Sequence, residues 1–226
     1  MSDSSTPKVR THPYRVTIAD GDSTADLPIL EGTLGPAAVN IQQLYGTHNL
    51  LAYDPGFRST ASCKSAITFI DGDAGVLLYR GYPIEELAEH SNFMEVAHLL
   101  MFGELPTLTE YKPFWTEISR HTLLHEQVLN FYRGFRRDAH PMAIMVGVVG
   151  ALSAFYHDDM DLQDRDSRIH AALRLLAKIP TIAAASHTYS VGRPIRYPCN
   201  DLDYAGNFLQ MLLGVPSEPY KVDPVL

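Results

Sequence analysis

Six residues of this chain carry groups that can bind a phosphate-bearing ligand. Arginine and lysine side chains donate hydrogen bonds to phosphate oxygens, and a tyrosine ring can stack on a base or bond a ribose. Three of the six end one predicted helix, one ends another, and two lie four residues apart on one face of a third. In chain order they are Arg120, His121, Thr122, Tyr156, Arg174 and Lys178. The alternative is that Arg174 and Lys178 form a solvated charged face, with Asp164 or Asp166 nearby.

Two histidines have the spacing of metal ligands. His121 and His125 are four residues apart on a predicted helix. The stretch that begins at His125 reads HEQVL, which is not the HExxH frame of a zinc enzyme. Histidines that pack or lie on the helix surface are therefore the favoured interpretation, and no metal site is predicted. The two cysteines, Cys63 and Cys199, form no CxxC motif and are predicted to be free thiols in a reducing compartment.

A basic cluster lies in the stretch RGFRRDAHP. Its members are Arg133, Arg136 and Arg137. Ion pairing with Asp138 and neighbouring acidic residues is the favoured interpretation. The alternative is a contact with another subunit or with a CoA phosphate.

The elements that position these residues are predicted to be short strands followed by helices. Residues of strand type around turn residues predict strands at 15–18 and 26–30, and a hairpin with strands at 67–70 and 76–79. Apolar residues at helical spacing predict the rest of the chain to be helical up to a proline-rich tail. The predicted helices are 37–45, 83–90, 93–102, 111–122, 125–135, 141–156, 167–177, 180–191 and 202–213.

Caps and breakers set several of these helix ends. Thr107 and Glu110 fit a capping box before the helix at 111–122. Asp201 is the predicted cap of the helix at 202–213, and Pro180 is predicted to begin a helix of its own. The helix at 141–156 is apolar almost all round, so it is predicted to lie at the centre of the fold.

Composition narrows the class of protein. The chain has 226 residues, of which 46% are hydrophobic and 19% charged, as in ordinary globular proteins. A formal net charge of −8 argues against general nucleic-acid binding. No apolar run reaches the length of about 18 residues that would suggest a membrane span. The first ten residues, MSDSSTPKVR, contain no apolar signal region, so a cytoplasmic protein is expected.

Eight motifs along the chain carry a family resemblance. The most informative is ITFIDGDAGVLLYRGYPIEELAEHS at residues 67–91. The others are DPGFRSTASCKS (54–65), FGELPT (102–107), RHTLLHEQ (120–127), FRRDAHPM (135–142), GALSAFYHD (150–158), LRLLAKIPTIAA (173–184) and NDLDYAGNFLQML (200–212). Together they span nearly the whole chain, and they resemble citrate synthase of the hexameric, NADH-regulated bacterial type.

The resemblance implies a mainly α protein with the citrate synthase fold, of which this chain would be the N-terminal half. Residues 1–12 would be a disordered N-terminus and 13–82 a small β-containing region. Residues 83–226 would be part of the large helical domain, without the C-terminal catalytic half. The implied reaction condenses acetyl-CoA with oxaloacetate to citrate and CoA, without a cofactor for catalysis.

The family's catalytic groups lie in HADHEQ-like, GxxHGGAN-like, GFGHRVY-like and NVDFY-like stretches. None of these stretches occurs in this chain, and the HEQ at 125–127 is a superficial match. No catalytic residue is therefore assigned, and the chain is expected to be inactive alone. The apolar helix at 141–156 would normally pack against other chain segments, so the isolated chain is expected to aggregate or to be an obligate oligomer.

The resemblance also implies a role for the six residues named first, because the matching positions bind NADH, an allosteric inhibitor, in the hexameric enzymes. It further implies a homo-oligomer, either a dimer or a hexamer. Two alternatives stay open. One is a non-catalytic module that binds NADH or assembles with a full-length partner. The other is a fragment of 2-methylcitrate synthase, which would use propionyl-CoA.

Overall fold

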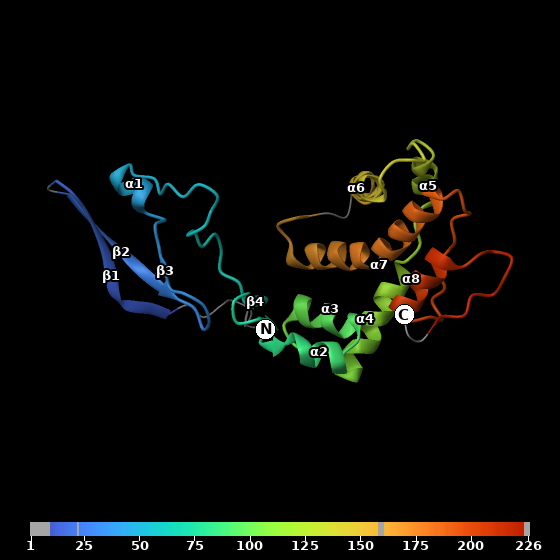
Figure 1. Cartoon of the computed structure of the whole chain (residues 1–226), viewed down its shortest axis with the longest axis horizontal. Coiled ribbons are helices and arrows are strands. Elements are labelled where there is room, and N and C mark those ends of the chain that lie inside the picture. Colours follow the sequence, from blue (N-terminus) through green and yellow to red (C-terminus); the bar gives the residue numbers. More distant parts are fainter. Residues whose placement is uncertain (1–9, 22, 158–160, 224–226) are drawn as a thin grey trace. The chain divides into compact units, whose positions relative to one another are not determined.

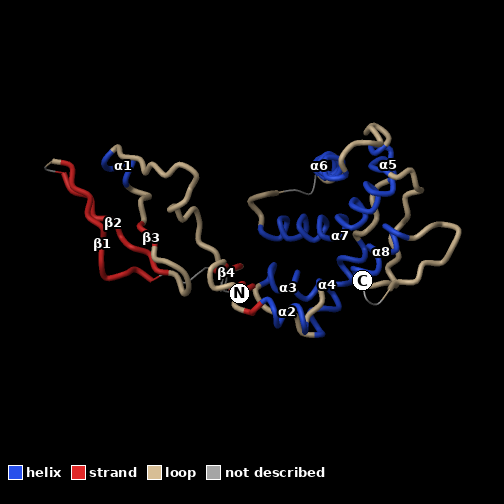
Figure 2. The backbone as a smooth tube through the Cα atoms, in the orientation of Figure 1, coloured by secondary structure: helices blue, strands red, loops and turns tan. Residues whose placement is uncertain are grey.

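The computed structural model describes residues 10–21, 23–157 and 161–223, which divide into two compact units (Figure 1). The first unit contains the residues up to Asn92 together with Val96–Leu105. The second contains Phe93–Glu95 and the residues from Pro106 onward. Figure 2 shows the strands in the first unit and most of the helices in the second. The prediction of a mainly α chain with a small β region is confirmed.

The first unit begins with an antiparallel sheet in the order β1-β2-β3. Its strands are β1 (Arg10–Asp20), β2 (Ser23–Glu31) and β3 (Ala38–Val39), and Ile18 lies opposite Ala25. The register shifts between Thr11 and Arg15, a segment that contains Pro13, which has no N–H for the ladder. Only a small core forms here, where Ala25 and Leu27 pack with Leu44 of α1 (Leu44–His48).

Two expectations for this region differ from the structure. Residues 10–12, expected to be disordered, belong to β1 because Arg10 and Thr11 pair with β2; residues 1–9 lie outside the described part of the chain. The helix expected at 37–45 is replaced by β3 and the short helix α1. Pairing of β3 with β2, with Ile29 opposite Val39, keeps the chain extended there, so that the helix begins only at Leu44.

A second antiparallel sheet confirms the predicted hairpin. It contains β4 (Thr68–Asp71), β5 (Val76–Tyr79) and β6 (Tyr82–Pro83), with Thr68 opposite Tyr79. The turn is closed by Asp71, whose Oδ1 accepts from the backbone N–H of Ala74 at 3.0 Å, and Gly75 takes a φ of +67°. Helices α2 (Ile84–His90) and α3 (Phe93–Phe102) follow.

The second unit is built on α4 (Leu108–Arg120), α5 (Glu126–Tyr132), α6 (Pro141–Leu152), α7 (Arg165–Ser190) and α8 (Tyr204–Leu213) (Figure 1). The predicted capping box at Thr107 and Glu110 is present. The core lies where α5 and α6 pack on α7, and it consists of Leu124, Val128, Tyr132, Ile144, Val148, Leu152, Ile182 and Ala185.

Helix α6 is buried on one face only. Ile144, Val148 and Leu152 are buried, whereas Met142 is 57% exposed and Val146 71% exposed. The expectation of a helix at the centre of the fold is therefore wrong for the face that carries Val146, because no described segment of this chain covers it. Among the described residues, no helix combines the length and the apolarity that a membrane crossing requires.

Helix α7 runs without a break through Pro180, whereas two separate helices were expected, at 167–177 and 180–191. A proline inside a helix removes the N–H that would bond the carbonyl four residues earlier, here that of Leu176. The hydroxyl of Tyr204 donates to this carbonyl at 2.8 Å. The carbonyl is therefore satisfied from a neighbouring helix, and α7 continues.

Two other helix ends differ from the expected ones. The cap of α8 is Asp203, whose Oδ1 accepts from Gly206 N at 2.7 Å, so the expected cap at Asp201 is wrong by two residues. Helix α6 ends at Leu152, and residues 153–156 form turns. Tyr156 therefore follows a turn and does not end a helix.

Candidate nucleotide-binding site

The six residues that the sequence singled out come from three places in the second unit. Arg120 is the last residue of α4, and His121 and Thr122 follow it. Tyr156 lies after α6, and Arg174 and Lys178 lie in α7. Hydrogen bonds join His121 and Thr122 to α7, a cation–π contact joins Tyr156 to α7, and Arg120 directly precedes His121 in the chain. The structure thus brings together three segments that lie apart in the sequence.

Lys178 is the most buried of the six, and the residue is 3% exposed. Its Nζ donates to the backbone carbonyl of His121 at 2.8 Å and also to that of Leu123. Burial, with a smaller contribution from the positive charge of Arg174, lowers the pKa of Lys178 to about 8. Lys178 therefore does not lie on an exposed charged face, and its hydrogen bonds are directed to the protein backbone.

Arg174 and Tyr156 form a cation–π pair. The Cζ of Arg174 lies 4.2 Å from the centre of the Tyr156 ring, and Lys178 Nζ lies 5.6 Å from the same centre. A guanidinium stacked on a ring still presents its edge N–H groups to an acceptor. The pair can therefore offer donors to a phosphate, while one face of the Tyr156 ring is already covered. Asp164, one of the two acids expected near Arg174, caps α7 by accepting from Ser167 N at 2.7 Å.

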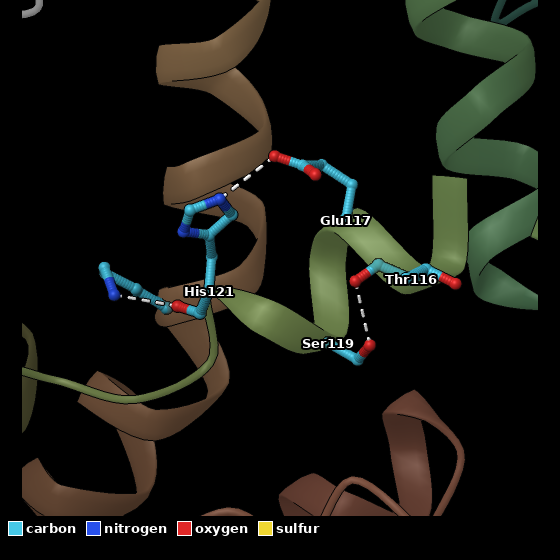
Figure 3. Close-up of polar contacts among 5 residues, drawn as sticks. Thr116, Glu117, Ser119 and His121 are labelled. Atoms are coloured by element: carbon cyan, nitrogen blue, oxygen red, sulfur yellow. Dashed lines mark hydrogen bonds and ion pairs between the residues drawn. The ribbon is translucent and has the colours of Figure 1, made fainter. Parts of the chain in front are cut away.

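His121 lies at the C-terminal end of α4 and contacts an acid of the same helix. Its Nε2 lies 3.0 Å from Oε1 of Glu117, as the close-up in Figure 3 shows. The ring and the carboxylate are both about one-third exposed, with side-chain exposures of 37% and 36%. Two residues before His121, Ser119 Oγ donates to the carbonyl of Thr116 at 3.0 Å (Figure 3).

Thr122 faces the protein interior. The residue is 8% exposed, and its hydroxyl contacts Asn200 Oδ1 at 3.1 Å and the carbonyl of Ser119 at 3.2 Å. Its own carbonyl accepts from Thr181 Oγ1 at 2.8 Å. Thr122 thus contributes to the site by fixing the backbone after α4.

The histidine pair that resembled metal ligands does not share a helix. His121 follows the end of α4, while His125 caps α5, where its Nδ1 accepts from Gln127 N at 3.1 Å. Residues 121–125, which join the two helices, are not helical. In the described ranges, no three His, Cys, Asp or Glu side chains gather as metal ligands would.

In the basic cluster after α5, the expected ion pairing with Asp138 is present at Arg136. Arg136 and Asp138 form a bidentate pair with N–O distances of 2.9 and 2.6 Å. Both side chains are largely exposed, at 84% and 68%, so the pair contributes little to stability.

Residues that the sequence did not single out complete the site. Glu117 contacts the His121 ring, and Thr181 and Asn200 hold the backbone and side chain of Thr122. Thr181 follows Lys178 by three residues, which places both on one face of α7. This spacing could have identified Thr181 from the sequence as a neighbour of Lys178. Asn200 lies 78 residues from Thr122, so no local sequence pattern predicts their contact.

Taken as chemistry, the site is an anion-binding arrangement with an aromatic surface. Arg120 is exposed, Arg174 is half-buried over Tyr156, and the His121 ring lies at the end of α4. The carboxylate of Glu117 contacts the His121 ring. Such a set suits a phosphate that is attached to a stacking or hydroxyl-bearing group.

Comparison with known proteins gives one consistent result. Residues 56–225 match the family described as "Citrate synthase, C-terminal domain". Among solved structures, citrate synthase from Pyrobaculum aerophilum is 31% identical with a TM-score of 0.65, over 76% of this chain and 43% of that one. Citrate synthase from Thermotoga maritima MSB8 is 30% identical with a TM-score of 0.60, over 70% of this chain and 41% of that one.

A third structure supports the fold alone. It is citrate synthase from Thermoplasma acidophilum in a ternary complex with carboxymethyl coenzyme A and oxaloacetate. It is 22% identical with a TM-score of 0.67, over 73% of this chain and 43% of that one. The predicted citrate synthase fold is thereby confirmed. The chain spans roughly two-fifths of the length of these relatives.

Proposed function

We propose the function of this chain from the finding that it belongs to the citrate synthase family. The proposed function is that of a citrate synthase, which joins acetyl-CoA to oxaloacetate and releases citrate and CoA in the tricarboxylic acid cycle. The observation that carries it is the family match over residues 56–225, supported by 31% identity to a solved citrate synthase. The Thermoplasma acidophilum citrate synthase is in complex with oxaloacetate and with carboxymethyl coenzyme A, a derivative of coenzyme A. The proposed location is the cytoplasm.

The chain is proposed to need further segments for this reaction. General acid–base work on a carbon acid requires a positioned base and a donor for the developing enolate oxygen. The family's stretches that supply these groups do not occur among the 226 residues. The chain would then act as the N-terminal half of the enzyme.

Release of CoA thiol from acetyl-CoA and oxaloacetate tests this proposal, measured on the purified chain with and without NADH. No turnover is expected from the chain alone, and turnover is expected when the missing stretches are supplied in one polypeptide. Measurable turnover by the chain alone would contradict the need for those stretches. Propionyl-CoA in parallel separates citrate from 2-methylcitrate synthesis.

The candidate site is proposed to bind NADH as an allosteric inhibitor, as in the hexameric, NADH-regulated bacterial type of the enzyme. The support is the cluster of Arg174, Tyr156 and His121 that this chain forms within one unit. The same observation favours a second candidate function, a non-catalytic module that binds NADH or assembles with a full-length partner.

NADH fluorescence titration of the 226-residue chain tests the site. Arg174→Gln is expected to weaken binding about tenfold, the loss of one charge-assisted contact. Arg165→Gln is the matched control, because Arg165 is an exposed arginine at the start of the same helix. Equal affinities of the two variants would argue against the site.

The chain is also proposed to form a homo-oligomer, a dimer or a hexamer. The support is the exposed apolar face of α6, which carries Met142 and Val146. The molar mass in solution, from size-exclusion chromatography with light scattering, is expected to be a multiple of the 25.1 kDa chain. A stable monomer would contradict this.

A further inference from the structure

The backbone segment after α4 is held by side chains of α7 in an unusual way. Three consecutive carbonyls, those of His121, Thr122 and Leu123, accept hydrogen bonds from two α7 residues. Lys178 donates to the first and the third, and Thr181 donates to the second at 2.8 Å. We call residues 121–123 the α4 exit segment.

Lys178 meets an electrostatic need of this segment. The last carbonyls of a helix have no partner within the helix, and the C-terminal end carries a partial negative charge. The ammonium group of Lys178 lies among carbonyls that directly follow the last residue of α4, so it satisfies them and complements the charge at this end of the helix. Ser119, one turn earlier, has its carbonyl satisfied by Asn200 Nδ2 at 2.9 Å. The exit from α4 is therefore fixed by side chains from distant parts of the unit.

The same contacts make Lys178 a poor direct ligand. The residue is 3% exposed, and its Nζ donates hydrogen bonds to two carbonyls. Arg120 is exposed and Arg174 is half-buried, so a phosphate approaching from solvent would meet these groups first. Because His121 belongs to the exit segment and Arg120 precedes it, the position of both depends on the contacts that Lys178 makes.

We infer that Lys178 is a positioning residue of the nucleotide site, which together with Thr181 fastens the α4 exit segment to α7 and so places His121 and Arg120 for the ligand. This inference rests on the proposed NADH site. According to this inference, the affinity of the site for its ligand depends on how the α4 exit segment is held against α7. It also gives Thr181, an uncharged residue, the same role as Lys178.

Four variants of the 226-residue chain test the inference. Lys178→Met removes the ammonium and keeps the length of the side chain. Thr181→Val removes the hydroxyl at nearly constant volume, and Thr181→Ser restores it. Lys112→Met is the matched control, because Lys112 is an exposed lysine of α4 and its loss changes the net charge equally.

The first measurement is amide hydrogen exchange of residues 121–125 without nucleotide. Lys178→Met and Thr181→Val are expected to exchange about tenfold faster than the unaltered chain, and Thr181→Ser and Lys112→Met within about twofold of it. Unchanged exchange in Lys178→Met would overturn the fastening role. This readout needs no ligand, so it stands apart from the proposed function.

The second measurement is NADH affinity by fluorescence titration on the folded variants. Lys178→Met and Thr181→Val are each expected to weaken binding about five- to tenfold, with rescue in Thr181→Ser. Weakening in Lys178→Met but not in Thr181→Val would make Lys178 a direct ligand and overturn the inference. Unchanged affinity in both would leave Lys178 a purely structural residue and also overturn it. If the unaltered chain binds no NADH, the proposed site fails and with it this role in nucleotide binding, while the exchange result still decides whether the segment is fastened.

Discussion

Tyr204 replaces the hydrogen bond that Pro180 removes from the middle of α7. The carbonyl of Leu176 would accept from the N–H of residue 180 in a regular helix, and proline has no N–H. The hydroxyl of Tyr204, the first residue of α8, donates to that carbonyl at 2.8 Å. Burial raises the pKa of Tyr204 to about 12, so the hydroxyl keeps its proton over the whole physiological range. The 26-residue helix thus depends on a partner in another helix.

Tyr204→Phe is expected to destabilise the chain by about 1–2 kcal/mol, because it leaves a half-buried carbonyl without a donor. The phenyl ring keeps its stacking on Phe93, whose centroid lies 4.6 Å away. Urea unfolding followed by circular dichroism measures the change. Tyr197→Phe is the matched control, since Tyr197 is exposed and donates to Glu126, and it is expected to cost less than about 0.5 kcal/mol.

A double-mutant cycle isolates the coupling. Pro180→Ala supplies an N–H to the Leu176 carbonyl, so Tyr204→Phe is expected to cost about 1 kcal/mol less in that background. Additive effects of the two substitutions would show that the Tyr204 hydroxyl does not compensate for Pro180.

The features that the sequence predicted correctly are those set by residues close together in the chain. The capping box needs only Thr107 and Glu110, and the hairpin needs only the turn around Asp71 and Gly75. The break expected at Pro180 followed from the same local rules. It was wrong because the compensating donor lies 28 residues from Leu176, where no local pattern can reveal it.

In the candidate site too, the sequence predicted what depends on neighbouring residues but not the contacts between distant ones. The spacing of Arg174 and Lys178 correctly placed both side chains on one face of α7. It could not show that the exit from α4 meets that face, because the contacts of Lys178 span 55 and 57 residues. The direction of Lys178, toward carbonyls and not toward solvent, is a tertiary property.

The histidine before α6 is expected to act as its cap. His140 Nδ1 accepts from Met142 N at 3.2 Å. His140→Ala is expected to lower the free energy of unfolding by about 1 kcal/mol, and His140→Asn, a good capping residue, by much less. Thermal and urea unfolding of the three chains measure this. Equal loss in both variants would indicate that the ring packs and does not cap.

The exposed face of α6 is expected to be an assembly surface. Val146→Glu would place a charge in the middle of that face, so it is expected to lower the molar mass in solution toward that of one chain. Leu108→Glu is the control, because Leu108 is 79% exposed at the start of α4. If Val146→Glu keeps the mass of the unaltered chain, another surface holds the oligomer together.

The pH dependence of stability is expected to report the burial of Lys178. Its folded-state pKa is about 8, whereas a lysine in an unfolded chain titrates near 10.4. Below pH 8 both states hold the proton, and the folded state bears the full cost of the buried charge. Between about pH 8 and 10 the folded state has released the proton and the unfolded state has not, so stability rises with pH.

Comparison with Lys178→Met removes the contributions of other groups. The variant leaves the carbonyls of His121 and Leu123 without this donor, so it is expected to be less stable throughout. The difference in unfolding free energy between the unaltered chain and the variant is expected to widen from pH 8 to 9.5, since a neutral amine still has two hydrogens for the two carbonyls. The range stops at pH 9.5 so that both chains stay folded: burial raises the pKa of Tyr132 and Tyr204 to about 12, and ionisation of these tyrosines in the unfolded state lowers the stability of both chains near pH 10. A difference that stays constant from pH 7 to 9.5 would mean that the ammonium keeps its proton in the folded chain, stabilised by the carbonyls at the end of α4 more strongly than burial disfavours it.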